Sequence, residues 1–65
     1  MTAHFEIYDR ADGDAGWRLQ AANGEIIATG EGFTRATDAE RAVHTLIDAI
    51  LQIADQSVDD SIIRV

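Results

Sequence analysis

The acidic loop near the N-terminus contains the residue types that most often bind calcium. Its carboxylates surround Gly13 and belong to Asp9, Asp12 and Asp14. An EF-hand loop places carboxylates at alternate positions and ends with a glutamate at position twelve. Here the first two aspartates are three residues apart, and position twelve counted from Asp9 is Gln20. The loop is therefore interpreted as a solvated acidic turn.

Two histidines and two adjacent aspartates are the other candidates for catalysis or metal binding. His4 and His44 could share a metal only if the fold brought them together, and both are expected on polar faces as exposed residues. Asp59 and Asp60 are neighbours in an acidic linker, whereas catalytic carboxylates face each other across a site. No Cys is present, and no Ser or His lies in a motif that would activate a nucleophile. We predict no catalytic residue, no metal and no cofactor.

The composition argues against nucleic acids and membranes as partners. Twelve Asp and Glu residues face five basic residues, all of them Arg, and the net charge is −7. Such a charge repels phosphate backbones and anionic membrane surfaces. An acidic, Lys-free, Asp-rich composition is typical of cytosolic proteins of salt-loving microbes, because high salt screens the self-repulsion. A GC-rich genome would also favour Arg over Lys. We hypothesise a halophilic source.

The length allows one domain, residues 1–65, with a marginal core. A domain of about 60 residues buries only ~60% of its unfolded surface, and small chains compensate with disulfides, a metal or self-association. Because Cys is absent, disulfides are excluded. The N-terminal residues lack the apolar core of a signal peptide, and no apolar run approaches the ~20 residues of a spanning helix. We expect a cytoplasmic protein.

Three short strands are predicted from alternating apolar and polar residues. They cover Phe5–Tyr8, about Trp17–Ala22 and Glu25 to about Thr29. Asn23-Gly24 is a strong hairpin signal and predicts a two-residue type I′ turn. This turn fixes a register in which Ala22 pairs with Glu25, Ala21 with Ile26, Leu19 with Ala28, and Trp17 with Gly30.

The predicted meander has one apolar and one polar face, so it needs a single covering layer. The apolar face consists of Phe5, Ile7, Trp17, Leu19, Ala21, Ile26 and Ala28. The other face consists of Glu6, Tyr8, Arg18, Gln20, Glu25, Ile27 and Thr29.

One long helix, Thr37–Ala54, is predicted to be that layer. Thr37 and Glu40 have the spacing of a capping box, in which each side chain binds an unpaired backbone amide. At ~100° per residue, the stripe facing the sheet consists of Ala39, Val43, Leu46, Ile50 and Ile53. Ile47 and Leu51 lie too far round the helix to reach the same sheet. They form an apolar shoulder, and the last turn of the helix is expected to overhang the sheet.

A fourth strand is predicted at the C-terminus, after a polar break at Asp55–Asp60. The segment Ser61–Val65 is rich in β-branched residues, which a frayed tail would leave without a partner. It could add to a sheet edge in its own chain or in a second copy.

The order of these segments carries a family resemblance. FEIY (5–8), WRLQAANGEIIA (17–28) and EGFT (31–34), followed by a helix, resemble the YegP-like family of uncharacterised domains. Phe33 stands where the family usually has Tyr. The resemblance implies a three-stranded meander with a helix, often repeated in one chain about a pseudo-two-fold axis. A single repeat with an extra C-terminal segment resembles the short haloarchaeal members, and the family brings no established activity, cofactor or catalytic residue.

These patterns predict an α+β fold: a three-stranded antiparallel meander packed on one long helix (βββα), with a short C-terminal strand. Because the chain has one repeat, a homodimer is expected to recreate the two-repeat arrangement. Because no catalytic residue is predicted, the expected function is that of a non-enzymatic interaction or structural module. Its predicted interface consists of Ile47, Leu51, Ile53, Ile62, Ile63 and Val65.

The alternative is a ligand- or nucleic-acid-binding domain that uses the exposed sheet face. The residues available there are Tyr8, Arg18, Gln20 and Ile27. An ordinary half-polar outer face is the simpler interpretation, and the net charge of −7 opposes nucleic-acid binding.

Overall fold

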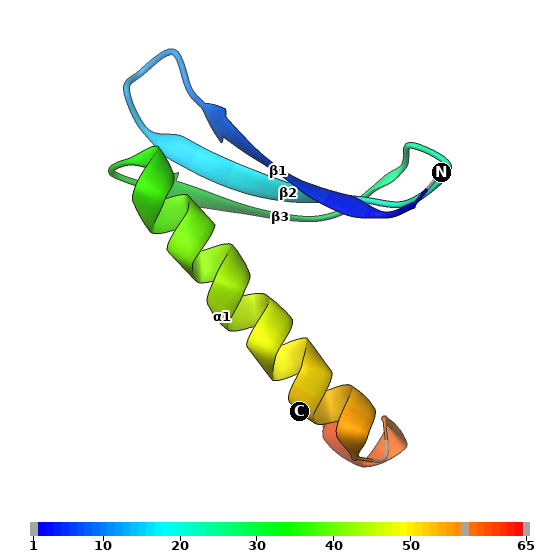
Figure 1. Ribbon diagram of the computed structural model, residues 1–65. Coiled ribbons are helices and arrows are strands. Elements are labelled where there is room, and N and C mark those ends of the chain that lie inside the picture. The colour runs from blue at the N-terminus through cyan, green and yellow to red at the C-terminus, as the bar shows by residue number, and fades with distance from the viewer. Residues whose placement is uncertain (1, 57, 65) are drawn as a thin grey trace.

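The alternating residues form an antiparallel sheet of three strands, followed by one long helix. The computed structural model describes residues 2–56 and 58–64. Its elements are β1 (His4–Asp9), β2 (Ala15–Gln20), β3 (Ile26–Phe33), α1 (Ala36–Asp55) and the 3₁₀ turn η1 (Asp59–Ser61). The strands pair in the order β1-β2-β3 (Figure 1). The predicted α+β class and the βββα order are confirmed.

Both hairpins close with the same three-residue turn. In the first, the amide of Arg10 donates to the carbonyl oxygen of Asp14 (2.6 Å), and the amide of Gly13 donates to the carbonyl oxygen of Arg10 (3.0 Å). In the second, Ala21 binds Glu25 (2.7 Å) and Gly24 binds Ala21 (2.9 Å) in the same way. The glycines have φ of +94° and +89°. This is the pattern of a type I turn followed by a left-handed residue.

The residue before each glycine stabilises its turn. The amide of Asp14 donates to Oδ1 of Asp12 (3.1 Å), and the amide of Glu25 donates to Oδ1 of Asn23 (3.0 Å). Asp and Asn favour turns for this reason, because the side chain binds a backbone amide two residues on. The acidic loop, predicted as a turn, is therefore a hairpin turn with the same chemistry as the Asn-Gly turn.

The predicted two-residue type I′ turn at Asn23-Gly24 is wrong. A type I′ turn needs a positive φ at both central residues, and among the described residues only glycines have one. The real turn adds a residue, so the register shifts between Leu19 and Gln20. Trp17↔Gly30 and Leu19↔Ala28 are confirmed, but Ile26 pairs with Gln20 instead of Ala21. Residues that pair directly lie on the same face of the sheet. Ile26 therefore lies beside Gln20 on the outer face, where it is 50% exposed.

Trp17 occupies the middle of the sheet. A Cβ on Gly30 would lie 2.8 Å from Cζ2 of the indole and closer still to Nε1 and Cε2, so the ring lies directly on the Gly30 backbone. The Phe5 ring meets the indole edge-on, with the centroids 5.7 Å apart. The buried hydrophobic side chains of the described chain are few and small: Ala15, Ala39 and Val43. The large side chain of Trp17 is half-buried beside this small core.

The start of α1 is fixed by packing instead of by the predicted capping box. Arg35 is the N-cap, with an extended backbone and no side-chain capping bond, and its carbonyl oxygen accepts the amides of Asp38 and Ala39. Thr37 lies inside the first turn and cannot cap it, since a capping residue must precede the first helical residue. Ala39 has no exposed surface, and its burial anchors this end against the sheet.

The C-terminal half of α1 leaves the sheet. The helix contacts all three strands, but it starts at one end of the sheet and diverges from it (Figure 1). A 20-residue helix is about 30 Å long, whereas a six-residue strand spans ~20 Å. Ile50 and Ile53 are 44% and 37% exposed. The prediction that they pack against their own sheet is therefore wrong, while the expected overhang is present and longer than predicted.

The C-terminal residues do not form a strand in the described part of the single chain. Ser61 closes η1: its amide and its hydroxyl both donate to the carbonyl oxygen of Val58, at 3.1 and 2.6 Å. Residues 62–64 follow without a strand partner. Val65 lies outside the described residues. A strand that forms only with a second copy stays a prediction.

Replacing Gly30 tests the contact with Trp17. Gly30→Ala should destabilise the fold by about 1–3 kcal/mol, because the new methyl group forces the indole out of its position. Gly24→Ala is the control: its Cβ meets nothing within 4 Å, and its cost is only left-handed strain, about 1–2 kcal/mol. Trp17 is the single Trp of the chain, so its fluorescence should change in Gly30→Ala alone. Identical spectra for the two variants would contradict the packing.

Candidate functional site

The most prominent exposed surface is the apolar side of α1 beyond the sheet. We call it the helix overhang, and it consists of Ile47, Ile50, Leu51 and Ile53. Their exposed fractions are 37%, 44%, 62% and 37%. Three- and four-residue spacing gathers these side chains on one side of the helix. Contiguous exposed apolar surface of this kind marks an interaction site.

A second apolar surface lies on the sheet. The inner face of the sheet, defined here as Phe5, Ile7, Trp17 and Leu19, is covered by α1 only where the helix starts (Figure 1). Ile7 is 38% exposed, and the other three side chains are half-buried. The chain thus leaves one apolar helix side and one apolar sheet face incompletely covered.

The whole chain is also less compact, and exposes more surface, than a globular domain of its size. Its radius of gyration is 13.5 Å, whereas a compact domain of this length has about 11 Å. Its accessible surface is 5158 Å², whereas a compact monomer of 7.1 kDa exposes about 4,100 Å². The excess, about 1,000 Å², is close to the ~800 Å² that one partner buries in a standard interface.

The outer sheet face carries a row of ion pairs. Nε of Arg18 lies 2.6 Å from Oε1 of Glu6, and its guanidinium carbon lies 5.1 Å from the centroid of the Tyr8 ring. Arg10 binds Glu31 at 2.8 Å. The Tyr8 hydroxyl donates to the same Glu31 carboxylate at 3.3 Å. These contacts join β1 to its neighbour β2 and, across β2, to β3.

Glu6 is the one described group whose pKa is clearly shifted. The hydrogen bond from Arg18 is the main cause, and the bond to Nε2 of His4 (3.2 Å) adds to it; together they lower the pKa of the Glu6 carboxyl below its ordinary value. The carboxylate is therefore ionised at neutral pH. An ionised glutamate held by two partners serves as an anchor and is a poor general acid.

The four outer-face candidates are all placed on this surface, and three have structural partners. Tyr8 packs against Gly16, where a Cβ would lie 2.7 Å from its ring. Arg18 is paired with Glu6, and Nε2 of Gln20 donates to the carbonyl oxygen of Gly24 (3.1 Å). Ile27 is 60% exposed. The only cation among these four is thus already neutralised.

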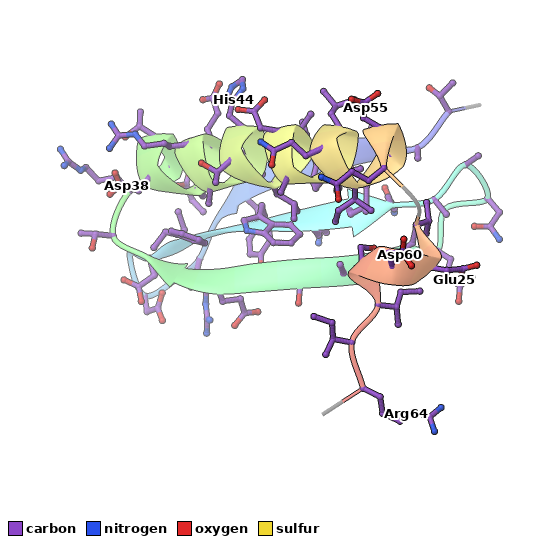
Figure 2. The ribbon with its side chains drawn as sticks, turned by 90° about the horizontal axis from the view of Figure 1, so that it is seen from below. Glu25, Asp38, His44, Asp55, Asp60 and Arg64 are labelled. Carbon is purple, nitrogen blue, oxygen red and sulfur yellow. The ribbon has the colours of Figure 1, made fainter. Side chains whose placement is uncertain are left out.

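The acidic and histidine candidates are not gathered into a site. Asp12 accepts the turn amide and lies 3.7 Å from Arg10. His44 is on α1 and points away from the sheet (Figure 2), whereas His4 is on β1 beside Glu6. The described residues contain no cluster of three potential metal ligands and no pocket. No helix in residues 2–56 and 58–64 is long and apolar enough to cross a membrane.

The predicted interface residues fall into two groups. Ile47, Leu51 and Ile53 belong to the helix overhang, while Ile62 and Ile63 are 71% and 78% exposed in the tail. Figure 2 shows Arg64 at the end of this tail, away from the sheet. Val65 lies outside the described residues. The sequence reading missed Ile50, although the difference in length between helix and strands was a signal for it.

The fold and its surfaces define a small α+β fold of βββα order. The family model described as a domain of unknown function, DUF1508, matches residues 11–49, and the chain belongs to this family. The predicted YegP-like membership is thereby confirmed.

Two kinds of relative support this assignment. UPF0339 proteins of Neisseria meningitidis serogroups A and B are each 54% identical over 43 residues, which are 66% of this chain and 77% of theirs. The NMR solution structure of a protein from Haloferax volcanii is similar, with a TM-score of 0.67 and 28% identity, over 98% of this chain and 97% of that one. The structural similarity therefore covers almost the whole length of both chains.

The Glu6 ion pair gives a pH-dependent prediction. A lowered pKa stabilises the folded state above the ordinary glutamate pKa of about 4.3, and this stability is lost as the pH falls through the lowered value. Wild type should therefore unfold at a higher urea concentration than Glu6→Gln at pH 7, and the difference should shrink towards pH 3.

The control is Glu25→Gln, because Glu25 forms no ion pair among the described residues. Its difference from wild type should not depend on the Arg18 contact. Arg18→Gln should reduce the pH dependence of the Glu6→Gln effect and leave only the part due to His4. A Glu6→Gln effect of equal size at both pH values would contradict the pairing.

Proposed function

We propose that the protein is a non-enzymatic module that works as a symmetric homodimer. In this dimer the helix overhang of each chain packs against the inner sheet face of the other. The observation that carries the proposal is the excess exposed surface of about 1,000 Å², which matches one side of a standard interface.

A second copy is the natural occupant because the two uncovered surfaces complement each other. The overhang offers an apolar helix side, and the inner face offers the apolar sheet surface that such a helix normally covers. Two-fold symmetry buries both surfaces of both chains, because the helix overhang of each chain then packs on the inner sheet face of the other. The dimer then resembles one divided core, as obligate interfaces do.

The charged residues support an interaction role over an enzymatic one. On the outer face of the sheet, Arg10 and Arg18 are held by the carboxylates of Glu31 and Glu6. The alternative, a ligand- or nucleic-acid-binding outer face, would have to break the Arg18–Glu6 pair to free a cation. At a net charge of −7, binding to phosphate backbones is opposed as well.

Leu51→Asp tests the interface directly. Leu51 is 62% exposed in the single chain, so the substitution leaves the monomer core intact and acts on association. Burying a Leu side chain contributes about 1.5–3 kcal/mol, and a symmetric dimer loses it twice. The dimer dissociation constant, measured by sedimentation, should therefore rise at least ~100-fold.

Gln52→Asp is the matched control, because it adds the same charge at the next residue. Position 52 lies about 180° round the helix axis from Val43, the centre of the sheet-facing stripe. It should leave association unchanged. Equal dimer strength in the two variants would exclude the helix overhang from the interface.

Salt should strengthen this dimer, in keeping with the hypothesis of a halophilic source. Association joins two chains of charge −7, and raising the salt from 0.1 to 1 M shortens the Debye length from about 10 to about 3 Å. We expect the melting temperature to rise with molar salt at constant protein concentration. A melt that is no more stable in molar salt than in dilute buffer would count against the hypothesis.

A further inference from the structure

The sheet has two open edges that differ in regularity. The order β1-β2-β3 leaves β1 and β3 at the edges. The pairing of β3 with β2 is interrupted at two places, and Gly32 within it has a φ of +88°. In contrast, β1 pairs with β2 over all six residues without a shift. Irregular edges resist a further strand and regular ones accept it.

The groups that β1 offers follow from its hairpin. The amide of Arg10 donates across the hairpin to Asp14, and antiparallel pairs alternate between bonded and non-bonded. Tyr8, Glu6 and His4 therefore direct their backbone groups to β2. The amides and carbonyls that point to the open edge belong to Phe5, Ile7 and Asp9. They are ready to pair with an extended segment.

The tail is such a segment. Ile62 has an extended backbone, with φ −94° and ψ 113°. The exposed fractions of Ile62 and Ile63, 71% and 78%, are the highest among the exposed large hydrophobic side chains. The tail is joined to the helix overhang by a short segment that contains η1 (Asp59–Ser61), so a helix that packs on the partner's sheet brings its tail near the margin of that sheet.

We propose that residues 62–64 pair with β1 of the second copy and extend each sheet to four strands. The inference rests on the proposed homodimer and names the segment and the edge that complete its interface. With Ile63 on the inner side, beside the 38% exposed Ile7, strand alternation puts Ile62 and Arg64 on the outer side. In this arrangement the guanidinium of Arg64 lies near the ion pairs of the outer sheet face, which include Glu6.

The test is amide hydrogen exchange on the full-length chain above its dimerisation concentration. In wild type, the edge amide of Ile7 should be protected, because it lies opposite the tail residues 62–64. The double variant Ile62→Pro/Ile63→Pro lacks both donors, one of which must face β1, so this amide should exchange at least ~10-fold faster. Ile62→Val/Ile63→Val keeps donors and β-branching and should behave as wild type.

A mixed dimer of labelled and unlabelled chains identifies the source of the strand. Contacts between Ile63 and Ile7 should join different chains. Contacts within one chain, an unprotected Ile7 amide in a wild-type dimer, or protection that survives the proline variant would each overturn the inference and leave the dimer standing. A wild-type monomer by light scattering would instead refute the proposed function itself.

Discussion

The structure depends on one mismatch: the helix is longer than the sheet on which it begins. Its first half has an alanine with no exposed surface and a buried valine against the strands, whereas its second half carries large aliphatic side chains into solvent. If the second half of α1 were polar, the chain would leave no large apolar surface of the helix exposed. Instead, the apolar stripe continues past the sheet. Because apolar burial is the main favourable term in folding, this continuation is the reason for proposing a core that is completed between chains.

The sheet is fixed by contacts of its own at the surface that the proposed dimer would use. Two identical hairpin turns, each with an Asx side chain bound to the backbone and a left-handed glycine, set the register of the three strands. The indole of Trp17 lies flat over Gly30 at the centre, and ion pairs join the strands on the outer face. The inner face is thereby presented as a preformed surface, and little ordering entropy is lost when a helix docks on it.

Much of this fold follows from the sequence, and the failures have physical causes. Alternation located the strands, and the helical stripe located α1. The Asn23-Gly24 turn was mistaken because the same dipeptide serves two loop lengths, and only the φ of Asn23 separates them. Ile50 was assigned to the sheet because periodicity gives the direction of a side chain round a helix but not where the helix axis departs from the sheet. Ser61 was predicted to begin a strand, but its hydroxyl donates to the carbonyl oxygen of Val58 and closes η1. β-Propensity does not include such a local hydrogen bond.

The direct measurement of the central claim is the mass of the wild-type chain in solution, by light scattering at micromolar concentration in dilute and in molar salt. A chain whose core is completed by its copy has twice the mass of the monomer, and the dimer persists on dilution further in high salt. A monodisperse, folded monomer in both buffers would contradict the claim, because it would show that the helix overhang and the inner face are stable in water without each other.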